Sequence, residues 1–271
     1  MPTPDRRIAP VNETPRKRGG DDTLKSMVKM LAVLDCFSVR EPQLTPSEIA
    51  RRTRIPRATA HRIVATMRQI GLLDQDRERD SYRLGLKLFE LGSRVIASMD
   101  LHREAAAPVD ELQQLTGEVV HLCVYNGLHM VLIQRRELDV APSNTITTME
   151  EAPAHCTGVG KAFLAFQDVE IQERLIAEGL TRFTASTLVD PQALRAEFAR
   201  IVAQGHAFDL EEHQTGIRCV AAPIRDATAR VVAAVSVSGA VARMPLTRLR
   251  ALAPSVRETA RAISIRLGWP G

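Results

Sequence analysis

Apolar residues recur at helical spacing in the first part of the chain, and each such stretch is interrupted by residues that favour turns. The spacing from Leu24 to Phe37 predicts a helix that is ended by Glu41-Pro42. Two shorter helices are expected at about 46–52 and about 56–70, with a turn between them. The pattern therefore predicts a helix-turn-helix.

Capping and turn residues support these limits. Thr45 can cap the second helix and Glu48 stands three residues later, which is the spacing of a capping box. Gly71 ends the third helix. Two short strands, at about 72–75 and 81–84, flank a charged turn and predict a β-hairpin. A helix-turn-helix followed by a hairpin is the winged arrangement.

The pattern changes after the hairpin. Two helices are expected at about 86–99 and 102–115, and beyond Gly117 strands and helices alternate. Asn126-Gly127 is a strong hairpin signal between the first two strands of this part. Strands are expected at about 119–125, 130–135, 206–210, 218–224 and 230–238, and helices at about 158–166, 170–178, 191–204 and 246–267.

This succession of elements predicts an α+β protein with two domains. Residues 1–20 hold Pro, Gly and basic residues with little apolar content, so we expect a disordered basic tail. Residues 21–85 form the predicted winged helix-turn-helix, and 86–100 a linker helix. Residues 101–271 form a larger, sensor-like domain of mixed strands and helices.

Charge is unevenly distributed along the chain. The net charge is +4, but the stretch Leu44–Leu72 alone holds six arginines and one acid. A basic patch beside a nearly neutral remainder indicates a polyanionic partner for the first domain only. A solvated arginine-rich helix face is the alternative interpretation of the same charges.

Several classes of protein are not supported by the sequence. No run of about 18 apolar residues is present, and the first twenty residues lack the apolar core of a secretory signal. We therefore expect a cytoplasmic protein without a membrane partner. The four cysteines are far apart and form no CxxC pair, which argues against a disulfide scaffold. No metal site is expected, because the following residues lack the short spacing of zinc ligands: His155, His206, His213 and Cys219.

The second helix of the helix-turn-helix offers candidate DNA contacts. Its apolar stripe points inward, so the remaining side chains near its N-terminus face outward and can reach base edges in a major groove. An arginine can bond a guanine through two donors. The arginines of the hairpin can meet phosphates. The candidates are Arg57, Ala58, Thr59, His61, Arg62, Arg77 and Arg79.

The second domain contains polar residues whose role the pattern leaves open. Ser236 and Ser238 alternate with valines, so both hydroxyls lie on one side of a strand. Together with Cys219 on another strand and Asp209 on a third, they suit a small polar or carboxylate ligand. The pattern alone favours the simpler interpretation that these are small residues chosen for packing.

Two catalytic interpretations are weak. Gly158-Val159-Gly160-Lys161 resembles part of a phosphate-binding loop, but His155 and Ala162 stand where that motif needs Gly and Ser or Thr. A nucleophilic set of Cys219, His213 and Asp209 has no surrounding motif to support it. No cofactor is expected.

Three segments resemble one known family in the right order. The segment SEIARRTRIPRATAHRIVATMRQIGLLDQD is similar to the winged helix of IclR-family regulators. HCTGVGKAFLAF and DLEEHQTGIRCVAAPIRDATARVVAAVSVSGAVAR are similar to two segments of that family's second domain. The resemblance extends from about Leu24 to the last helix. It departs at Arg54, where the family often has Gly, and a positive φ there would strain the arginine.

The resemblance implies a GAF-like effector-binding domain after the winged helix. Carried over by motif, the residues expected to bind the effector are Gly158, Val159, Asp209, Cys219, Ser236 and Ser238. It also implies a homodimer or a homotetramer, in which two recognition helices read a pseudo-palindromic operator in double-stranded DNA.

The expected function is therefore transcriptional regulation, with operator affinity modulated by a small carboxylate or aromatic effector. A metabolic enzyme with an accessory basic domain is the main alternative, and a non-specific nucleic-acid architectural protein is a weaker one. The sequence does not decide between repression and activation.

Overall fold

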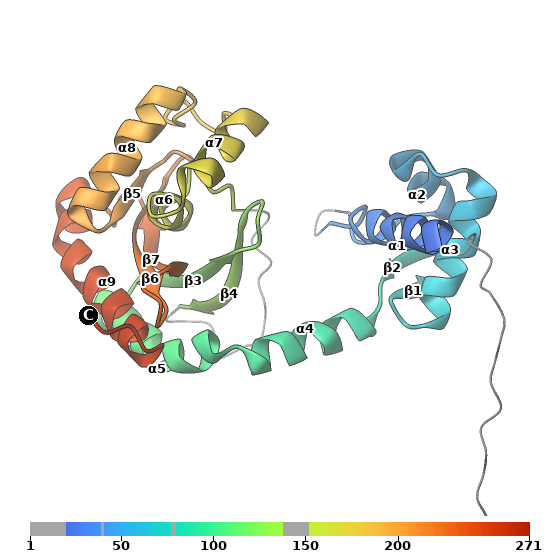
Figure 1. Ribbon diagram of the computed structural model, residues 1–271, viewed down its shortest axis with the longest axis horizontal. Helices are drawn as coiled ribbons and strands as arrows, with labels where there is room; N and C mark the ends of the chain where they lie inside the picture. The colour runs from blue at the N-terminus through green and yellow to red at the C-terminus, as the bar shows by residue number, and fades with distance from the viewer. Residues whose placement is uncertain (1–19, 39–40, 77–79, 138–151) are drawn as a thin grey trace, which may run out of the picture. The chain divides into compact units, whose positions relative to one another are not determined.

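The chain forms two compact units. In the computed structural model, residues 20–38, 41–76, 80–137 and 152–271 are described. The first unit extends to Gly92 and the second begins at Ser93. Helix α4 (Leu86–Ser98) carries the chain from one unit into the next (Figure 1).

The first unit is a helix-turn-helix followed by a hairpin. Its apolar side chains form one core, in which Ile49, Val64 and Met67 are fully buried. Leu44 pairs with Tyr82 through two backbone hydrogen bonds of 2.9 and 2.8 Å, so the segment before the second helix is fixed to the hairpin. The elements are α1 (Gly20–Leu34), α2 (Pro46–Thr53), α3 (Arg57–Gln69), β1 (Leu73–Asp76) and β2 (Ser81–Leu84).

Local interactions explain where α2 begins and ends. The Glu48 backbone N–H donates to Thr45 Oγ1 at 3.3 Å, and the Thr45 N–H donates to the Glu48 carboxylate at 2.8 Å, which confirms the capping box. Arg54 ends the helix in the left-handed conformation, with φ of 56°. This conformation is costly for a residue with a Cβ, so the expected strain at Arg54 is confirmed.

The second unit is built around one antiparallel sheet. Its five strands lie in the order β4-β3-β7-β6-β5, so β4 and β5 form the two edges. The strands are β3 (Val119–Tyr125), β4 (Met130–Arg136), β5 (Ala207–Leu210), β6 (Ile217–Arg225) and β7 (Val231–Ala240). The helices are α5 (Asp100–Thr116), α6 (Gly158–Leu164), α7 (Val169–Glu178), α8 (Pro191–Gln204) and α9 (Leu246–Arg266).

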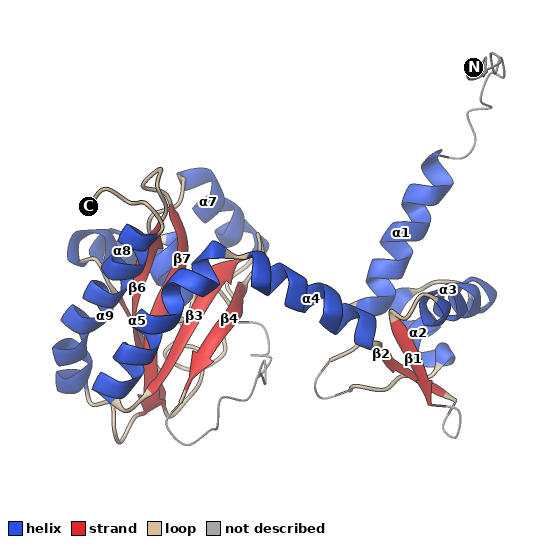
Figure 2. Cartoon of the chain, turned by 90° about the horizontal axis from the view of Figure 1, so that it is seen from below, coloured by secondary structure: helices blue, strands red, loops and turns tan. Residues whose placement is uncertain are grey.

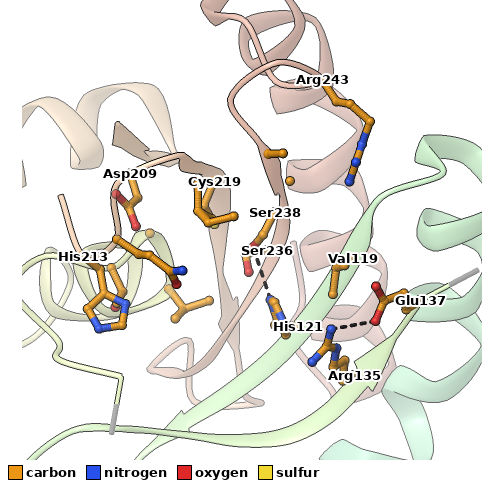
Figure 3. A pocket seen from close by; sticks show the side chains of 17 residues that line it. Val119, His121, Arg135, Glu137, Asp209, His213, Cys219, Ser236, Ser238 and Arg243 are labelled. Atoms are coloured by element: carbon orange, nitrogen blue, oxygen red, sulfur yellow. Dashed lines mark hydrogen bonds and ion pairs between the residues drawn. The ribbon is translucent and has the colours of Figure 1, made fainter. Parts of the chain in front are cut away.

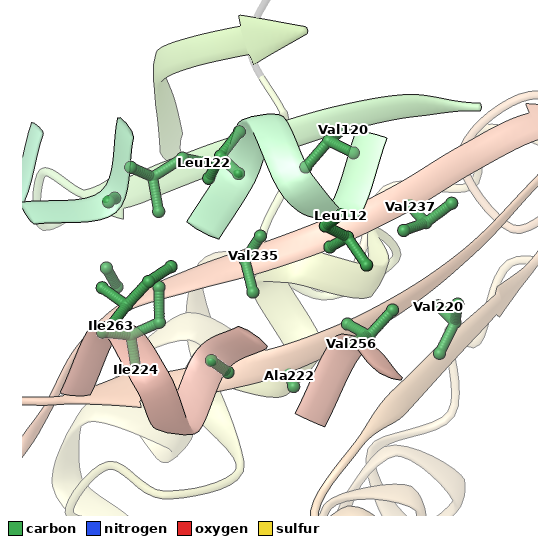
Figure 4. Packing of buried hydrophobic residues seen from close by; sticks show 14 of the residues in the cluster. Leu112, Val120, Leu122, Val220, Ala222, Ile224, Val235, Val237, Val256 and Ile263 are labelled. Atoms are coloured by element: carbon green, nitrogen blue, oxygen red, sulfur yellow. The ribbon is translucent and has the colours of Figure 1, made fainter. Parts of the chain in front are cut away.

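Helices cover both faces of this sheet (Figure 2). On one face α5 and α9 pack over alternate strand residues such as Val220, Val235 and Val237, all fully buried (Figure 4). On the other face α6 and α8 pack over the intervening residues, such as Ala221 and Ala234. The alternation of side chains along each strand thus separates two apolar layers. The face under α6 also carries the polar residues discussed below.

The predicted α+β class, with a winged helix-turn-helix and a second mixed domain, is confirmed. Most element limits agree with the sequence pattern to within two residues. The prediction of the first helix is wrong at its end, because the helical spacing was expected to continue to Phe37 whereas α1 ends at Leu34. The backbone N–H groups of Cys36 and Phe37 donate to carbonyls three residues earlier, which replaces helical by tighter turn geometry. Among the helices described, none combines the length and the apolar character needed to cross a membrane.

Candidate functional site

The N-terminal part of α3 presents polar side chains to the solvent. Arg57, Ala58, His61 and Arg62 are exposed and Thr59 is half-buried, whereas Ala60 and Val64 on the opposite side are buried in the core. The five described DNA candidates therefore share the outward face of one helix. Arg77 and Arg79 lie outside the described residues.

A hollow beside this helix brings one of these candidates, Arg57, together with two arginines that the sequence did not single out, Arg51 and Arg54. Arg51 on α2, Arg54 in the turn and Arg57 on α3 line a depression of about 590 Å³, and Glu48 is the one acidic residue that lines it with them. Within the described parts of the chain, none of these three guanidinium groups forms an ion pair. They are free to meet an external anion such as a DNA phosphate.

Another arginine of the basic patch has a structural role instead. Arg52 forms two hydrogen bonds with the Glu41 carboxylate, at 3.0 and 2.8 Å, and a third with the Cys36 carbonyl at 3.3 Å. It ties α2 to the end of α1. The number of arginines in this stretch of sequence is therefore larger than the number that can bind a partner.

In the second unit, a pocket of about 510 Å³ opens on the face of the sheet that α6 covers (Figure 3). All six residues selected from the sequence line it: Gly158, Val159, Asp209, Cys219, Ser236 and Ser238. Asp209, Cys219 and Ser236 are each less than a tenth exposed. The structure thus brings together residues from α6 and three strands that are up to 80 positions apart.

Strand register explains this convergence. Asp209 on β5 stands opposite Cys219 on β6, which stands opposite Ser238 on β7, which stands opposite Val119 on β3. Side chains of cross-strand partners point to the same face of a sheet. One continuous row therefore crosses four strands on the floor of the pocket, and Ser236 lies in the next row, opposite His121.

The start of α6 forms the wall above this row. Thr157 caps the helix by accepting a hydrogen bond from the Gly160 N–H at 3.2 Å. A Cβ on Gly158 would lie 2.9 Å from Cys219 Sγ, so a side chain there would push the helix away from the sheet. The glycine allows α6 to approach the pocket floor directly.

Asp209 holds the acidic position of the pocket. Its Oδ1 accepts a hydrogen bond from the Glu212 backbone N–H at 2.8 Å. Burial is the main cause that raises the pKa of Asp209 to about 7, and the nearby Glu212 carboxylate adds to the increase, against the opposing effect of Lys161. Near neutral pH this carboxyl is therefore divided between its neutral and its charged form.

The other polar groups of the floor are neutral. His121 Nδ1 and Ser238 Oγ share a hydrogen bond at 3.2 Å. Burial, assisted by Arg135, lowers the pKa of His121 to about 4, so the imidazole is uncharged at neutral pH. Burial and the nearby Asp209 raise the pKa of the Cys219 thiol to about 12. The floor thus offers neutral hydroxyl, thiol and imidazole groups.

Two arginines at the pocket are paired with acids. Arg135 lies 2.6 Å from the Glu137 carboxylate, and Arg243 lies 3.0 Å from the Glu118 carboxylate. The Glu118 side chain is only 2% exposed, which fixes the position of its partner. An anionic ligand would meet guanidinium groups that are already held in place.

A buried ion cluster supports the wall behind Asp209. Lys161 on α6 is 1% exposed, and its Nζ bonds the Glu212 carboxylate and the Glu197 carboxylate, the latter at 3.3 Å. Because both contacts occupy the ammonium group inside the protein, Lys161 cannot reach a phosphate. This agrees with the rejection of a phosphate-loop function.

The pocket does not support nucleophilic catalysis. A reactive cysteine needs a lowered pKa, but the pKa of Cys219 is raised. His213 lines the pocket and packs edge-on against Phe183 at 5.3 Å between ring centres. No group of three or more His, Cys, Asp or Glu side chains in the described ranges is arranged to hold a metal ion.

Several lining residues were missed by the sequence analysis. His121 stood in a predicted strand as a single polar residue among apolar ones, which was a usable signal. Arg135, Glu137 and Arg243 carried no such signal, because surface arginines and acids are common at strand ends and turns. Only the register and the sheet order bring them to this pocket.

Comparison with known proteins identifies both units. Residues 26–77 match the model of the IclR helix-turn-helix domain, and residues 93–265 match the model named Bacterial transcriptional regulator IclR C-terminal. The HTH-type transcriptional regulator XynR of Escherichia coli is 32% identical over 248 residues, which are 91% of this chain and 98% of that protein.

Solved structures share the fold over nearly the whole chain. An IclR transcriptional regulator from Silicibacter sp. TM1040 matches with a TM-score of 0.79 and 25% identity, over 90% of this chain and 96% of the other. An IclR homologue from Microbacterium hydrocarbonoxydans, solved with 4-hydroxybenzoate, matches with a TM-score of 0.75 and 28% identity, over 89% and 98%. These relatives are regulators, so the alternative of a metabolic enzyme is set aside.

The raised pKa of Asp209 predicts a pH-dependent stability. Between its ordinary pKa of 3.8 and about 7, the folded chain holds a proton that the unfolded chain releases. The free energy of unfolding should therefore fall as the pH rises through this range. In Asp209→Asn the fall should be shallower, with a remainder from Glu212, whose pKa burial also raises.

Urea unfolding at about pH 5 and about pH 8 measures this difference. Trp269 is the only tryptophan and lies just after α9, so its fluorescence reports on the second unit. Asp168→Asn, an exposed position before α7, serves as the control and should keep the wild-type pH dependence. An equally steep fall in Asp209→Asn would contradict the assignment.

Proposed function

Because the chain belongs to the IclR family of bacterial transcriptional regulators, we propose that it binds an operator with its first unit and a small organic effector with its second. In this proposal residues 21–85 bind DNA, 86–100 connect the domains, and 101–271 bind the effector and form oligomers. The protein acts in the cytoplasm. The predicted basic tail of residues 1–20, of which 1–19 lie outside the described residues, adds to the positive charge of the DNA-binding part of the sequence.

The observation that carries the proposal is that one chain contains both an exposed basic helix, α3, and a polar pocket in its second unit. On α3 the proposed base contacts are Arg57, Ala58, Thr59, His61 and Arg62, because they share its outward face. A recognition helix places its N-terminal residues against base edges.

Other arginines are proposed to contact the DNA backbone. Arg51 and Arg54 lie beside Arg57 in the same hollow, where a phosphate can approach all three. Arg77 and Arg79 are proposed as phosphate contacts from the turn between β1 and β2. Phosphate contacts set the register of a protein on DNA, whereas base contacts set its specificity.

The effector is proposed to be a small carboxylate, with aromatic monocarboxylates as the first candidates. A volume of about 510 Å³ lies within the usual size of ligand pockets. Ser236, Ser238 and Cys219 supply neutral donors on the floor, while Val159 and Ile217 supply apolar contacts. The bound 4-hydroxybenzoate of the Microbacterium homologue supports this ligand class.

Gly158 and Asp209 complete the proposed effector site. A carboxylate beside Asp209 favours the protonated form of that side chain, since two adjacent negative charges repel each other. Because the pKa of Asp209 is about 7, protonation of this side chain costs little free energy at neutral pH. Effector binding alters DNA affinity only if the effector prefers one of two protein conformations. The relatives named AllR are repressors, and we propose repression here as well.

Apolar side chains on α1 indicate a contact between copies of the chain. Met27, Val28 and Leu31 form a stripe on one side of this helix and are 64%, 67% and 59% exposed. On α4, Leu86 and Phe89 are also more than half exposed. Contiguous exposed apolar patches mark interaction sites. We propose a homodimer through these helices, alone or within a tetramer, that reads a pseudo-palindromic operator.

Operator binding tests the function directly. Fluorescence anisotropy in about 0.15 M salt should show a preference of about 10³-fold or more for the intergenic DNA upstream of its own gene over scrambled DNA of equal length. Arg62→Ala should weaken specific binding about tenfold or more, through loss of one base contact. Arg195→Ala, which removes an arginine paired with Glu173, is the control. Equal affinity for both DNAs would leave only non-specific charge attraction.

Removal of the two pocket hydroxyls should abolish effector binding and leave DNA binding intact. We expect saturable heats when 4-hydroxybenzoate is titrated into the full chain, and their loss in Ser236→Ala/Ser238→Ala. Ser186→Ala, at an exposed position outside the pocket, should behave as the wild type. Unchanged titrations in the double variant would exclude this pocket, and absence of heat in the wild type at millimolar concentration would exclude the aromatic class.

A charge placed in the exposed stripe should break the dimer. Leu31→Glu would bury an unpaired carboxylate in the contact, so light scattering after gel filtration should show a lower mass than for the wild type. Leu128→Glu changes an equally exposed leucine in the turn between β3 and β4 and should leave the mass unchanged. A wild-type mass for Leu31→Glu would place the contact elsewhere.

A further inference from the structure

A second pocket, of about 410 Å³, lies at the β5 edge of the sheet and is separate from the proposed effector site. It is formed between α8, β5 and α9, and none of its residues lines the first pocket. Helix α8 contributes Arg200 and Gln204 to its walls. Strand β5 contributes Phe208 and Leu210, and His206 lies just before that strand. Helix α9 contributes Leu246, Arg250, Ala253, Pro254 and Arg257.

Positive charge is concentrated in this pocket. Three arginines and one histidine line it, and no acidic side chain does. Arg200 is already bound to Glu197, at 2.8 and 2.7 Å. Within the described part of the chain, neither Arg250 nor Arg257 has a carboxylate within 4.0 Å. Two guanidinium groups therefore face the pocket without a counter-charge.

The arginines elsewhere on α9 are different. Arg248 lies 3.2 Å from the Glu118 carboxylate, and Arg261 lies 3.5 Å from that of Glu258. Arg266 donates to the Glu104 carbonyl at 3.4 Å. The arginines outside the pocket are thus paired by the chain itself, and those inside it are left for an external anion.

The surroundings fix these charges in place. Gly205 ends α8 with φ of 73°, and a Cβ there would lie 3.2 Å from Arg257 Nε, so the guanidinium group rests against backbone. His206 Nδ1 lies 3.1 Å from the Gln204 carbonyl, which orients the ring and leaves Nε2 for a ligand. Burial lowers the pKa of His206, and Arg257 and Arg200 lower it further, which reflects the positive potential of the pocket.

We propose that this pocket binds a small organic anion with at least two negatively charged oxygen atoms, such as a di- or tricarboxylate or a phosphate compound. The planar guanidinium group of arginine donates paired hydrogen bonds to the oxygen atoms of a carboxylate or a phosphate. Phe208 and Ala253, each about a twentieth exposed, give the pocket an apolar floor. The volume fits a metabolite rather than a protein segment.

The site is distinct from the proposed effector pocket, since the two share no lining residue. Side chains alternate along β5, so Phe208 and Leu210 face α9 while Asp209 faces α6. The two pockets therefore lie on opposite faces of one four-residue strand. An anion bound at the second pocket can act on the first through this strand, but its binding requires neither DNA nor effector.

Calorimetry with the full chain tests the proposal. Citrate and inorganic pyrophosphate are titrated separately at constant ionic strength, which distinguishes carboxylate from phosphate recognition. At least one should bind saturably, and Arg250→Ala/Arg257→Ala should lower its affinity about tenfold or more. Arg261→Ala removes a paired arginine from the same helix and should change the affinity less than twofold.

A pH series adds a second readout. As the pH falls through the pKa of His206, the protonated ring adds a positive charge and a donor, so the affinity of the wild type should increase relative to that of His206→Gln. This comparison cancels the titration of the anion itself, which both proteins share. Trp269 lies just after α9, so its fluorescence reports whether the second unit of each variant is folded.

Three results would overturn the proposal. The first is the absence of saturable binding by both probes. The second is equal affinity in the double variant and in Arg261→Ala. The third is a lower oligomer mass of the double variant in the absence of any anion, which would assign the pocket to a contact between copies of the chain.

Discussion

One buried ammonium group holds the wall of the first pocket together. Lys161 connects α6 to α8 through Glu197 and to the turn after β5 through Glu212, and the same turn donates a backbone hydrogen bond to Asp209. Breaking a buried ion pair by removing one partner typically costs about 3–5 kcal/mol. The approach of α6 to the sheet and the position of the pocket acid therefore depend on a residue that does not itself line the pocket.

This arrangement also limits how much charge the wall can hold. Glu197, Glu212 and Asp209 surround one lysine, and Glu212 Oε2 is buried without a hydrogen-bond partner in the described structure. Arg200 neutralises part of Glu197 from the solvent side. Burial is the main cause that raises the pKa of both Asp209 and Glu212, and for Asp209 the nearby Glu212 carboxylate adds to the increase. Asp209 can therefore be charged beside a neutral ligand group or protonated beside an anionic one.

Periodicity and capping predicted most elements, because those signals are local. Helix α8 has the limits expected from the sequence, and in the structure Asp190 caps it, Pro191 begins it and Gly205 ends it. The role of Lys161 was not predictable, because its partners are 36 and 51 residues away. The six residues expected to bind the effector came from the resemblance, and the structure adds the reason why they converge, which is strand register. Arg250 and Arg257 were overlooked, because only tertiary packing shows which arginines lack a partner.

The alternation of side chains along β5 has a consequence for how this protein can diverge. A substitution at Asp209 alters the chemistry on one face of the strand, and a substitution at Phe208 alters the other, while the backbone pairing with β6 stays the same. Duplicated copies of such a gene can therefore acquire a new ligand on one side and keep the old one on the other. The adjacent positions 208 and 209 would then be under selection for two different ligands.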